Sequence, residues 1–421
     1  MLNRDTGIDV DLDRRDALKT IGTAAAGTTL AGVASAKTTR ISVGYAADSG
    51  KRAAVEAAES VVYDFAFDAV TVLASATALA GLEDRDDVRY VEEEFELEVV
   101  GQTLPWGIDR VDADVAHADG ETGGDGTDGE GGIDVAVIDT GIDDDHPDLQ
   151  GNVADPSVDS NHRAYTTCLG LNCNYAWSDD NDHGTHVAGT VTAADNGEGV
   201  VGVSTEARLH ALKVCGSAGF CGSSDIADAL QYAADQGWDV ANLSLGGSYS
   251  SVIDDAGKYA YDNGVLLVAA AGNDGPCSDC VGYPAANEEF VAVSATTCGD
   301  GLADFSSTGP EVELAAPGDS VYSTVIGGYD TFSGTSMAAP HVAGVAAQLM
   351  NNGYDNATQT SADAESASDY PGSPGGARGQ LQDSAENVGL GADEQGEGLV
   401  DAAASLGLDS SDDGTGNGPN C

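Results

Sequence analysis

The sequence predicts a protein of the α/β class, with a buried sheet and helices packed closely on it. An apolar run at Ile133–Ile138, interrupted only by Asp134, is typical of a strand that is covered on both faces. Stretches of small residues at Val187–Val191 and Ala338–Leu349 are typical of buried helices. With 421 residues, 41% of them hydrophobic, the chain can bury a large core and form more than one folding unit.

Asp139, His183 and Ser336 stand where these elements end or begin. Asp139 ends the apolar run, and His183 and Ser336 each come shortly before a small-residue helix. A serine hydroxyl is a poor nucleophile at neutral pH, so a neighbouring imidazole must accept its proton during attack. A carboxylate holds that imidazole in the correct tautomer and stabilises its charged form. We therefore interpret Ser336 as a nucleophile, His183 as its base and Asp139 as the orienting carboxylate.

The segments around these residues are long enough to suggest a family. They are Val-Ile-Asp-Thr-Gly at 137–141, His-Gly-Thr-His-Val-Ala-Gly at 183–189 and Gly-Thr-Ser-Met-Ala-Ala-Pro at 334–340. From Gln102 to Leu408 the chain resembles the subtilisin-like serine proteases, whose order of Asp, His and Ser it shares, and within them the secreted halolysins of halophilic archaea. The resemblance implies a catalytic domain at 101–408, built as a three-layer α/β/α sandwich around a largely parallel sheet.

Each of the three residues also has an ordinary structural explanation. An Asp after a strand is commonly a turn or cap residue, and Ser336 alone is typical of a helix cap. A His in a glycine-rich stretch is more often structural than catalytic. All three occur in family order and inside family segments, which makes coincidence negligible. His186 and His341 lie in the same segments, and we interpret them as buried helix residues.

The resemblance also implies an oxyanion hole and a substrate groove. Leu266–Asn273 is similar to the strand and turn that carry the family's oxyanion-hole asparagine, here Asn273, although Asn-Asp-Gly alone is a common turn signal. The Ser336 backbone N–H would be the second donor. The expected groove residues are Ser244, Leu245 and Gly246 on one wall, Gly219 on the other, and Gly282 at the floor of the pocket for the residue before the cut. A glycine floor leaves room for large apolar side chains, so we expect broad specificity.

A calcium site is implied by the loop at 194–200, Ala-Asp-Asn-Gly-Glu-Gly-Val, which resembles the high-affinity calcium loop of the family. Backbone carbonyl, amide and carboxylate oxygens suit Ca²⁺. An Asn-Gly turn is the simpler interpretation of the loop alone, and two further matching positions elsewhere in the chain favour calcium. The expected ligands are Gln102, Asp148, Ala194, Asn196, Glu198 and Val200. A second, weaker cation site is considered near Ala285 and Glu313.

Residues 1–36 are typical of a twin-arginine export signal, which implies a secreted protein. Arg14 and Arg15 precede a moderately apolar stretch, Ile21–Val33, that ends in Ala-Ser-Ala at 34–36 and is too short to span a membrane. A soluble amphipathic arm would not account for these features together. The remaining sequence contains no apolar stretch long enough to cross a bilayer.

Residues 37–100 are predicted to form a separate α+β unit. We predict strands at 40–45, 70–74 and 88–93, and helices at 50–64 and 76–82. The unit resembles the inhibitory propeptide of subtilases, which would block the groove until it is cut between about residues 94 and 102. The alternative is an ordinary domain that the mature protein retains. At the other end, 409–421 is interpreted as an acidic disordered tail.

The charge of the chain is extreme, with a formal net charge of −55 and a pI near 4.1. Mutual repulsion should strain the compact state in dilute buffer, and molar salt should screen it. We therefore predict a halophilic enzyme, and we exclude nucleic acids and anionic membranes as partners. Apolar periodicity argues against an acidic disordered protein. From residue 101 onward the basic residues are Arg110, Arg163, Arg208, Lys213, Lys258 and Arg378.

Eight cysteines, an even number, favour disulfides in an exported protein. Cys168 with Cys173, and Cys215 with Cys221, are close enough in sequence to bridge single loops. Cys277-x-x-Cys280 is also compatible with half of a zinc site, but no second matching pair follows. The remaining cysteines are Cys298 and Cys421. The sequence does not fix the connectivity.

Two classes of function remain open at this point. The first is a monomeric endopeptidase that hydrolyses proteins and peptides through an acyl-enzyme on Ser336, with its own propeptide as intramolecular inhibitor. The second is a catalytically silent subtilase fold that serves as a binding scaffold. The three segments and Asn273 favour the enzyme. Within the enzyme class, a narrow processing protease is the alternative to one of broad specificity.

Overall fold

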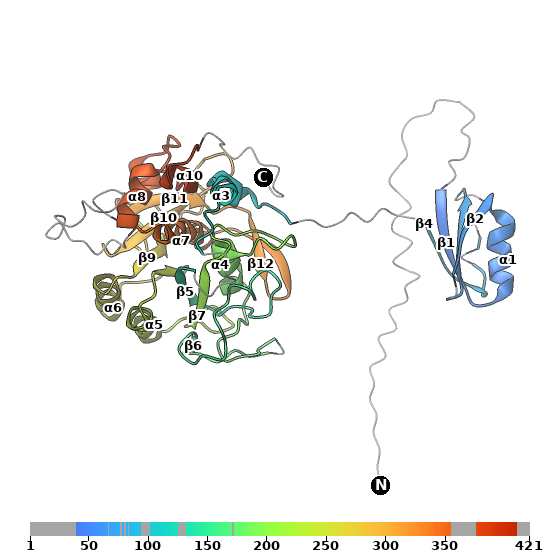
Figure 1. Cartoon of the computed structure of the whole chain (residues 1–421), viewed down its shortest axis with the longest axis horizontal. Coiled ribbons are helices and arrows are strands. Elements are labelled where there is room, and N and C mark those ends of the chain that lie inside the picture. Colours follow the sequence, from blue (N-terminus) through green and yellow to red (C-terminus); the bar gives the residue numbers. More distant parts are fainter. Residues whose placement is uncertain are drawn as a thin grey trace, which may run out of the picture. The chain divides into compact units, whose positions relative to one another are not determined.

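The computed structural model describes residues 39–65, 67–75, 78–79, 81–82, 84–93, 102–124, 132–170, 172–354 and 376–410. Contacts divide the chain into two compact units, Met1–Val99 and Val100–Cys421, each described below by itself (Figure 1). This division falls beside the boundary predicted at residue 100. The signal peptide predicted at 1–36 lies outside the described residues, as does the predicted tail from residue 411 onward.

The first unit is an antiparallel sheet with the strand order β2-β3-β1-β4. Its core joins Ile41 and Val43 of β1 to Val70 and Val72 of β3, and Ala54 of the helix packs against them. The elements are β1 (Thr39–Tyr45), α1 (Asp48–Ala57), β2 (Ser60–Phe65), β3 (Ala69–Ala74) and β4 (Val88–Glu93).

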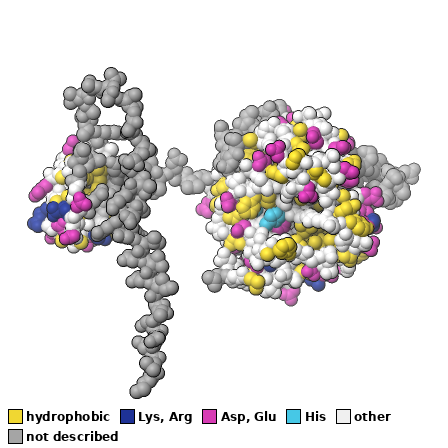
Figure 2. Space-filling view, turned by 180° about the vertical axis from the view of Figure 1, so that it is seen from behind, with side chains coloured by type: hydrophobic (Ala, Val, Ile, Leu, Met, Phe, Trp, Pro, Cys, Tyr) yellow, Lys and Arg dark blue, Asp and Glu magenta, His cyan; other side chains and the backbone are white. Residues whose placement is uncertain are grey.

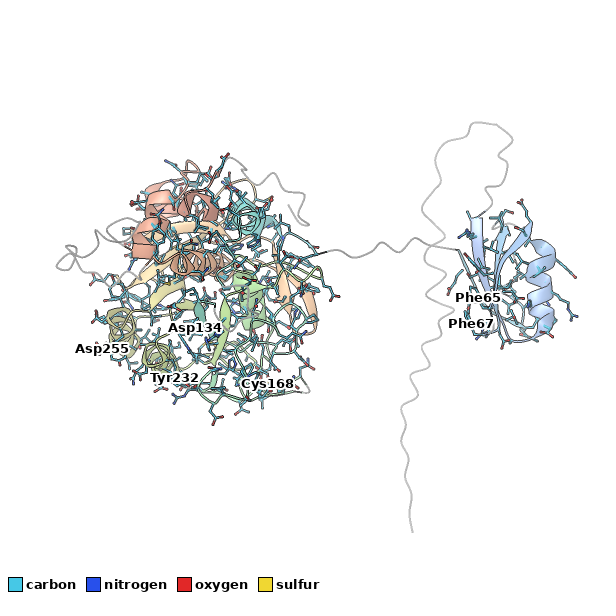
Figure 3. The ribbon with its side chains drawn as sticks, viewed as in Figure 1. Phe65, Phe67, Asp134, Cys168, Tyr232 and Asp255 are labelled. Atoms are coloured by element: carbon cyan, nitrogen blue, oxygen red, sulfur yellow. A yellow bond between two sulfur atoms is a disulfide. The ribbon has the colours of Figure 1, made fainter. Side chains whose placement is uncertain are left out.

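Two predictions for this unit are wrong. The helix predicted at 50–64 ends at Ala57, and Ser60–Phe65 is strand β2, since its β-branched and aromatic side chains favour a pleated surface. The rings of Phe65 and Phe67 stack 4.8 Å apart along this edge (Figure 3). The described residues of 76–82 form turns instead of a helix, and Gly81 there has a left-handed backbone (φ +87°).

The centre of the second unit is a parallel sheet of seven strands in the order β11-β10-β9-β8-β5-β7-β6. The middle strands β9 and β10 are buried over their whole length, as in a sheet that is covered on both faces. The strands are β5 (Asp134–Asp139), β6 (Arg163–Ala164), β7 (Arg208–Lys213), β8 (Val240–Leu243), β9 (Leu266–Ala270), β10 (Phe290–Thr296) and β11 (Val312–Pro317).

Helices cover both faces of this sheet. Because side chains alternate along a strand, Val268 of β9 lies in the core that contains α7 residues, and Leu267 lies in the core that contains α5 and α6 residues. The predicted three-layer α/β/α sandwich with a largely parallel sheet is therefore confirmed (Figure 1). The covering helices are α4 (His183–Thr192), α5 (Ser223–Gln236), α6 (Ser251–Asp262) and α7 (Thr335–Asn351).

Shorter elements complete the second unit. A hairpin precedes α7. Short helices come before β5 and after α7 in the sequence. These elements are α2 (Trp106–Arg110), α3 (Ala113–Ala118), β12 (Val321–Val325), β13 (Gly328–Phe332), α8 (Gly376–Ser384), α9 (Ala392–Gln395) and α10 (Ala402–Ser405). None of the helices in the described part of the chain is long and apolar enough to cross a membrane.

Three disulfides close short loops in the second unit. They join Cys168 to Cys173, Cys215 to Cys221 and Cys277 to Cys280. The first two agree with the loops that the spacing suggested. The third uses both sulfurs of the Cys-x-x-Cys pair, so the zinc alternative for that pair is wrong. Cys298 is also disulfide-bonded, and Cys421 lies outside the described residues.

Candidate active site

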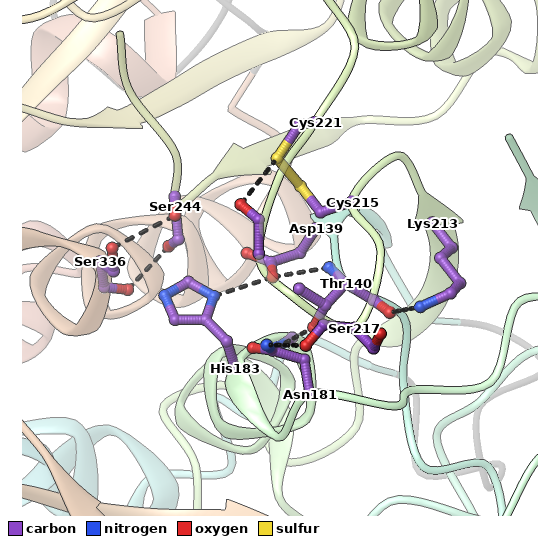
Figure 4. The surroundings of a disulfide bond; sticks show 12 residues. Asp139, Thr140, Asn181, His183, Lys213, Cys215, Ser217, Cys221, Ser244 and Ser336 are labelled. Atoms are coloured by element: carbon purple, nitrogen blue, oxygen red, sulfur yellow. Dashed lines mark hydrogen bonds and ion pairs between the residues drawn. A yellow bond between two sulfur atoms is a disulfide. The ribbon is translucent and has the colours of Figure 1, made fainter. Parts of the chain in front are cut away.

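Asp139, His183 and Ser336 come together from three elements of the second unit. Asp139 is the last residue of β5, His183 is the first residue of α4, and Ser336 is the second residue of α7. His183 Nδ1 lies 2.8 Å from Asp139 Oδ1. Figure 4 shows Ser336 on the side of the His183 ring that faces away from Asp139. The acid, the imidazole and the alcohol thus lie in the order that proton transfer requires.

Gly184 allows the Asp139 and His183 segments to touch, because a Cβ there would overlap the Gly141 carbonyl oxygen. Gly141, whose φ is +112°, meets a different segment, since a Cβ there would lie 2.5 Å from the Trp177 carbonyl oxygen. Both glycines are therefore explained by a close approach of backbone, Gly184 to the Asp139 segment and Gly141 to Trp177.

The electrostatics of His183 are dominated by carboxylates. Burial alone would lower the pKa of His183, but the Asp139 carboxylate and, with a smaller effect, Asp179 outweigh it and raise that pKa. Asp139 is only 1% exposed, and its Oδ1 also accepts a hydrogen bond from Thr140 N at 2.7 Å. Because Nδ1 faces a carboxylate it carries the ring proton, which leaves Nε2 as the acceptor.

The Ser336 hydroxyl is bonded to a backbone carbonyl in this structure. Its Oγ donates to the Ser244 carbonyl oxygen at 3.2 Å, and Ser244 Oγ donates to the Ser336 carbonyl oxygen at 2.7 Å (Figure 4). In this state the Ser336 hydroxyl is directed to Ser244 instead of His183. Loose catalytic hydrogen bonds are common in enzymes without substrate and tighten when it binds.

Asn273 follows strand β9 and is held by the residue before the serine. Its Oδ1 accepts hydrogen bonds from Thr335 N at 2.9 Å and from Thr335 Oγ1 at 3.1 Å. This fixes the plane of the amide and turns Nδ2 away from Thr335, so that its hydrogens remain for another acceptor. Thr335, which the sequence did not single out, is thus the residue that orients Asn273.

The expected groove residues lie in two places. Ser244, Leu245 and Gly246 follow strand β8, and Gly247 N donates to the Tyr283 carbonyl oxygen at 2.9 Å, which places this segment beside Gly282. A Cβ on Gly282 would make ordinary van der Waals contacts, the nearest with the Ala271 carbonyl oxygen at 3.7 Å, so backbone atoms of two segments border this position. Gly219 is exposed on the loop closed by the Cys215–Cys221 disulfide, and Asn181 Nδ2 ties that loop to the His183 segment through the Ser217 carbonyl oxygen at 2.9 Å.

Comparison with known proteins decides the family. A sequence model described as "Subtilase family" matches residues 130–399. The chain belongs to the subtilase family. It is 41% identical over 292 residues to M-protease of Shouchella clausii, covering 67% of this chain and 69% of that protein. It is 38% identical over 278 residues to Subtilisin E of Bacillus subtilis, covering 65% and 68%, and 43% identical over 262 residues to Alkaline elastase YaB of a Bacillus species, covering 62% and 63%.

Membership of this family makes the chain a serine endopeptidase, a hydrolase of peptide bonds in protein substrates, as the sequence predicted. The parallel sheet with helices on both faces agrees with the subtilase fold. The Asp-His-Ser set is characteristic of the family. The roles of individual residues in this subtilase are taken up below.

The six residues expected to bind calcium lie together in this subtilase. Gln102 Nε2 donates to the carbonyl oxygens of Ala194 and Val200, at 2.7 and 2.9 Å. Fully buried Asp148 accepts from Asn196 Nδ2 at 3.2 Å and from Val200 N at 2.9 Å. Glu198 N donates to Asn196 Oδ1 at 2.8 Å. Two carbonyl oxygens therefore converge on one amide nitrogen, beside a buried carboxylate.

Tyr329 of strand β13, which the sequence did not single out, also reaches this loop. Burial and a hydrogen bond to Asp148 raise the pKa of the Tyr329 hydroxyl. Across the described residues, no group of three or more His, Cys, Asp and Glu side chains has the arrangement of a metal site. A cation in the loop would therefore rest mainly on carbonyl and amide oxygens, the donor types that suit Ca²⁺.

The second, weaker cation site considered near Ala285 and Glu313 has a different occupant. Arg378 Nε lies 2.7 Å from one Glu313 oxygen, and Arg378 Nη2 lies 2.5 Å from the other. A two-point ion pair of this kind neutralises the carboxylate, so the guanidinium takes the place of a cation at Glu313.

Proposed function

We propose that this subtilase is a secreted, salt-adapted endopeptidase of broad specificity, similar to the halolysins of halophilic archaea. We further propose that Ser336, His183 and Asp139 carry its chemistry. The observation that supports these roles most directly is the 2.8 Å contact between His183 Nδ1 and Asp139 Oδ1, with Ser336 beside the other edge of the ring.

In the proposed mechanism, Ser336 Oγ attacks the carbonyl carbon of the scissile peptide bond while its proton passes to His183 Nε2. Asp139 stabilises the resulting imidazolium. When the C–N bond breaks, that proton passes to the leaving amine, and the acyl group remains on Ser336 as an ester. A water molecule then attacks the ester and gives a proton to His183, after which the acid leaves and Ser336 regains its hydrogen.

Asn273 and the Ser336 N–H are proposed to bind the oxyanion that forms during both attacks. The hydrogen bonds from Thr335 to Asn273 Oδ1 support this role, because they hold the amide in place before substrate arrives. We propose that the substrate binds as an extended strand between the Ser244–Gly246 segment and the Gly219 loop. We propose that Gly282, which has no side chain and lies beside Gly247 and Ala271, forms the floor of a pocket that accepts large apolar side chains.

We also propose that Gln102, Asp148, Ala194, Asn196, Glu198 and Val200 hold Ca²⁺. A half-turn of the Gln102 amide would present Oε1 where Nε2 now faces the two carbonyl oxygens, at the loss of the 3.2 Å hydrogen bond that Oε1 accepts from Gly197 N. The bound ion would neutralise Asp148 and cross-link Gln102 to the loop at 194–200. It has no part in the proton transfers at Ser336.

Export, self-inhibition and salt adaptation are proposals that rest on the sequence. Residues 1–36 would direct twin-arginine export, and 37–100 would act as an inhibitory propeptide that is cut before Gln102. The strands and helix of the first unit are compatible with that role. The face drawn in Figure 2 carries many scattered acidic side chains, which supports a requirement for salt. We expect the mature enzyme to be a monomer.

The experiment that tests this proposal labels the serine with a fluorophosphonate probe and measures casein hydrolysis in molar salt. The full chain is allowed to mature, and Ser336→Ala is compared with Ser333→Ala, a nearby exposed serine bonded to Asp319. We expect Ser336→Ala to abolish labelling and hydrolysis, and Ser333→Ala to retain both. A folded wild-type protein that is never labelled would instead be a silent scaffold.

Two further measurements test the finer parts of the proposal. Digestion of a peptide library is expected to give cuts after large apolar residues, and cuts mainly after Lys, Arg or Glu would contradict the assignment of Gly282. Dialysis to low salt with calcium present is expected to inactivate the enzyme. Full activity after that dialysis would refute the salt adaptation.

A further inference from the structure

A lysine is completely buried beneath the proposed triad. Lys213, the last residue of β7, is one of the largest fully buried side chains among the described residues, although the second unit has few basic residues. Its Nζ lies 2.6 Å from Oδ1 of Asp180, whose side chain is 4% exposed. The other oxygen of Asp180 accepts a hydrogen bond from Leu169 N at 2.7 Å, inside the loop closed by Cys168 and Cys173. Both oxygens of this carboxylate are therefore held.

The second partner of Lys213 is the residue that follows the proposed catalytic carboxylate. Lys213 Nζ donates to the Thr140 carbonyl oxygen (Figure 4). Thr140 N donates to Asp139 Oδ1 at 2.7 Å, and Thr140 Oγ1 donates to Asp179 Oδ1 at 2.8 Å. The same Oγ1 accepts from Gly184 N, next to His183, at 2.8 Å. Every polar group of Thr140 is thus engaged, and Lys213 holds its carbonyl.

The restraint on Asp139 depends on this arrangement. Asp139 Oδ2 is buried and has no hydrogen-bond partner among the described residues. Its Oδ1 is bound by Thr140 N and by His183 Nδ1. Thr140 N belongs to the Asp139–Thr140 peptide, whose carbonyl accepts from Val214 N and Cys215 N at 3.0 and 3.1 Å. The carbonyl of the next peptide, Thr140–Gly141, is the one that Lys213 holds. The residue that binds Asp139 Oδ1 is therefore anchored through both of its peptides, and Lys213 anchors the second.

Stability alone does not explain a charged pair in this place. A buried ion pair loses so much solvation that well-packed apolar residues of similar size are commonly as stable or more stable. Breaking such a pair on one side is strongly destabilising, because one charge remains buried without a partner. The pair contacts the carbonyl of Thr140, the residue whose N–H binds Asp139, and this contact gives it a function that an apolar pair would lack.

We propose that Lys213 is a positioning residue for the catalytic carboxylate. Neutralised by Asp180, its ammonium group holds the Thr140 carbonyl and so anchors the residue whose N–H binds Asp139 Oδ1. Asp139 in turn holds the proton of His183 on Nδ1. The inference rests on the role proposed above for Asp139. It assigns the buried Lys213–Asp180 pair an indirect role, because this pair acts through Thr140 and does not contact the substrate.

The experiment compares Lys213→Met with Lys258→Met in the full matured enzyme. Lys258 is a matched control, because it also pairs with an aspartate, Asp254 at 2.8 Å, but lies exposed on α6. We expect Lys213→Met to lower kcat by about 10- to 100-fold at nearly unchanged KM, as a small misplacement of a catalytic group does. Lys258→Met should leave both constants unchanged. Rates are divided by the concentration of active sites, found by titration with a fluorophosphonate.

A spectroscopic measurement distinguishes a change in the position of the Asp139 carboxylate from a general loss of stability. The proton between His183 Nδ1 and Asp139 gives a downfield NMR resonance that reports the geometry of that hydrogen bond. We expect this resonance to move or broaden in Lys213→Met and to stay in place in Lys258→Met. An unchanged resonance together with an unchanged kcat would overturn the proposal.

A double variant keeps the proposal testable if the single variant does not fold. Lys213→Met/Asp180→Asn leaves no unpaired buried charge, so it should regain stability, yet it still lacks the donor to Thr140. We expect its kcat to remain low. A double variant with the kcat of the wild type would show that Lys213 only neutralises Asp180. Failure of the triad assignment is distinguishable, because the wild-type enzyme itself would then not be labelled at Ser336.

Discussion

Substitution of Asn273 separates two tasks of one side chain. Its Oδ1 accepts two hydrogen bonds from Thr335, beside the proposed nucleophile, whereas Nδ2 is the proposed donor to the oxyanion. Asn273→Asp keeps an acceptor for Thr335 but has no N–H group. Asn273→Ala removes the acceptor and the donor together. The two variants therefore distinguish oxyanion binding from support of the Thr335–Ser336 segment.

The expected magnitudes follow from these contacts. Loss of one oxyanion donor costs about 2.7–4 kcal/mol in the transition state, or about 10²–10³ in kcat, a value measured in the relative subtilisin. Loss of the two Thr335 hydrogen bonds at this partly exposed position should lower the free energy of unfolding by about 1–2 kcal/mol. We expect both effects in Asn273→Ala. In Asn273→Asp we expect a larger loss of kcat, because the carboxylate repels the oxyanion, with a smaller loss of stability.

The assay measures kcat and KM on a peptide anilide in molar salt, with active sites titrated. Unfolding is followed in urea in a Ser336→Ala background, which prevents self-digestion. KM should change little, since the donor acts mainly on the transition state. The reasoning is refuted if kcat falls less than ~10-fold in both variants, or if a rise in KM accounts for the whole loss of kcat/KM.

Two further predictions concern pH and calcium. The pKa of His183 is raised, since carboxylates outweigh the effect of burial, so the neutral base and with it kcat/KM should be lost as pH falls through that raised pKa. Because Asp179 contributes to the rise, Asp179→Asn should move this acid limb to lower pH, and a pH–rate profile that moves upward would contradict the assignment. Ca²⁺ at a hundredfold excess over its dissociation constant should stabilise the Ser336→Ala protein by about 2.7 kcal/mol, measured by thermal unfolding. Gln102→Ala should reduce that gain, and a gain that is equal with and without Gln102 would argue against the loop as the site.

The fold and the residues near the triad were accessible from sequence because their signals are local. The strand that ends at Asp139 and the helices that begin at His183 and Thr335 are continuous runs of apolar or small residues. Gly184, which allows the Asp139 and His183 segments to touch, lies inside one of these runs. A pattern read over a few residues therefore sufficed for the sheet, its helices and the position of each polar residue at their ends.

The contacts that hold the proposed catalytic residues in place could not be predicted from local sequence patterns. Thr140, Asp180 and Lys213 lie in three separate segments, and no pattern shows that the lysine is buried. Thr335 orients Asn273 from 62 residues away. In the first unit, the alanine-rich helix runs directly into a strand-forming segment, and its end at Ala57 is decided by pairing of β2 with β3. Contacts between distant segments decided each of these cases.

The distribution of positive charge gives a physical reason for the proposed need for salt. Each basic side chain of the second unit forms an ion pair with one or two carboxylates. These few pairs therefore cannot compensate the charge of the many other carboxylates of the unit. The pairs are Arg110 with Asp300 and Glu386, Arg163 with Asp228, Arg208 with Asp134, Lys213 with Asp180, Lys258 with Asp254, and Arg378 with Glu313.

Salt acts differently on the two kinds of charge. The side chains of Arg110, Lys213 and Arg378 are at most 17% exposed, so mobile ions screen their pairs little. The exposed acidic side chains lie in water, where their repulsion falls steeply as the Debye length shrinks to about 3 Å in molar salt. Added salt should therefore stabilise the fold, because it reduces the repulsion between exposed carboxylates without weakening the buried ion pairs. The Lys213–Asp180 pair, and the carboxylate that depends on it, should keep one geometry over the whole range of salt in which the protein is folded.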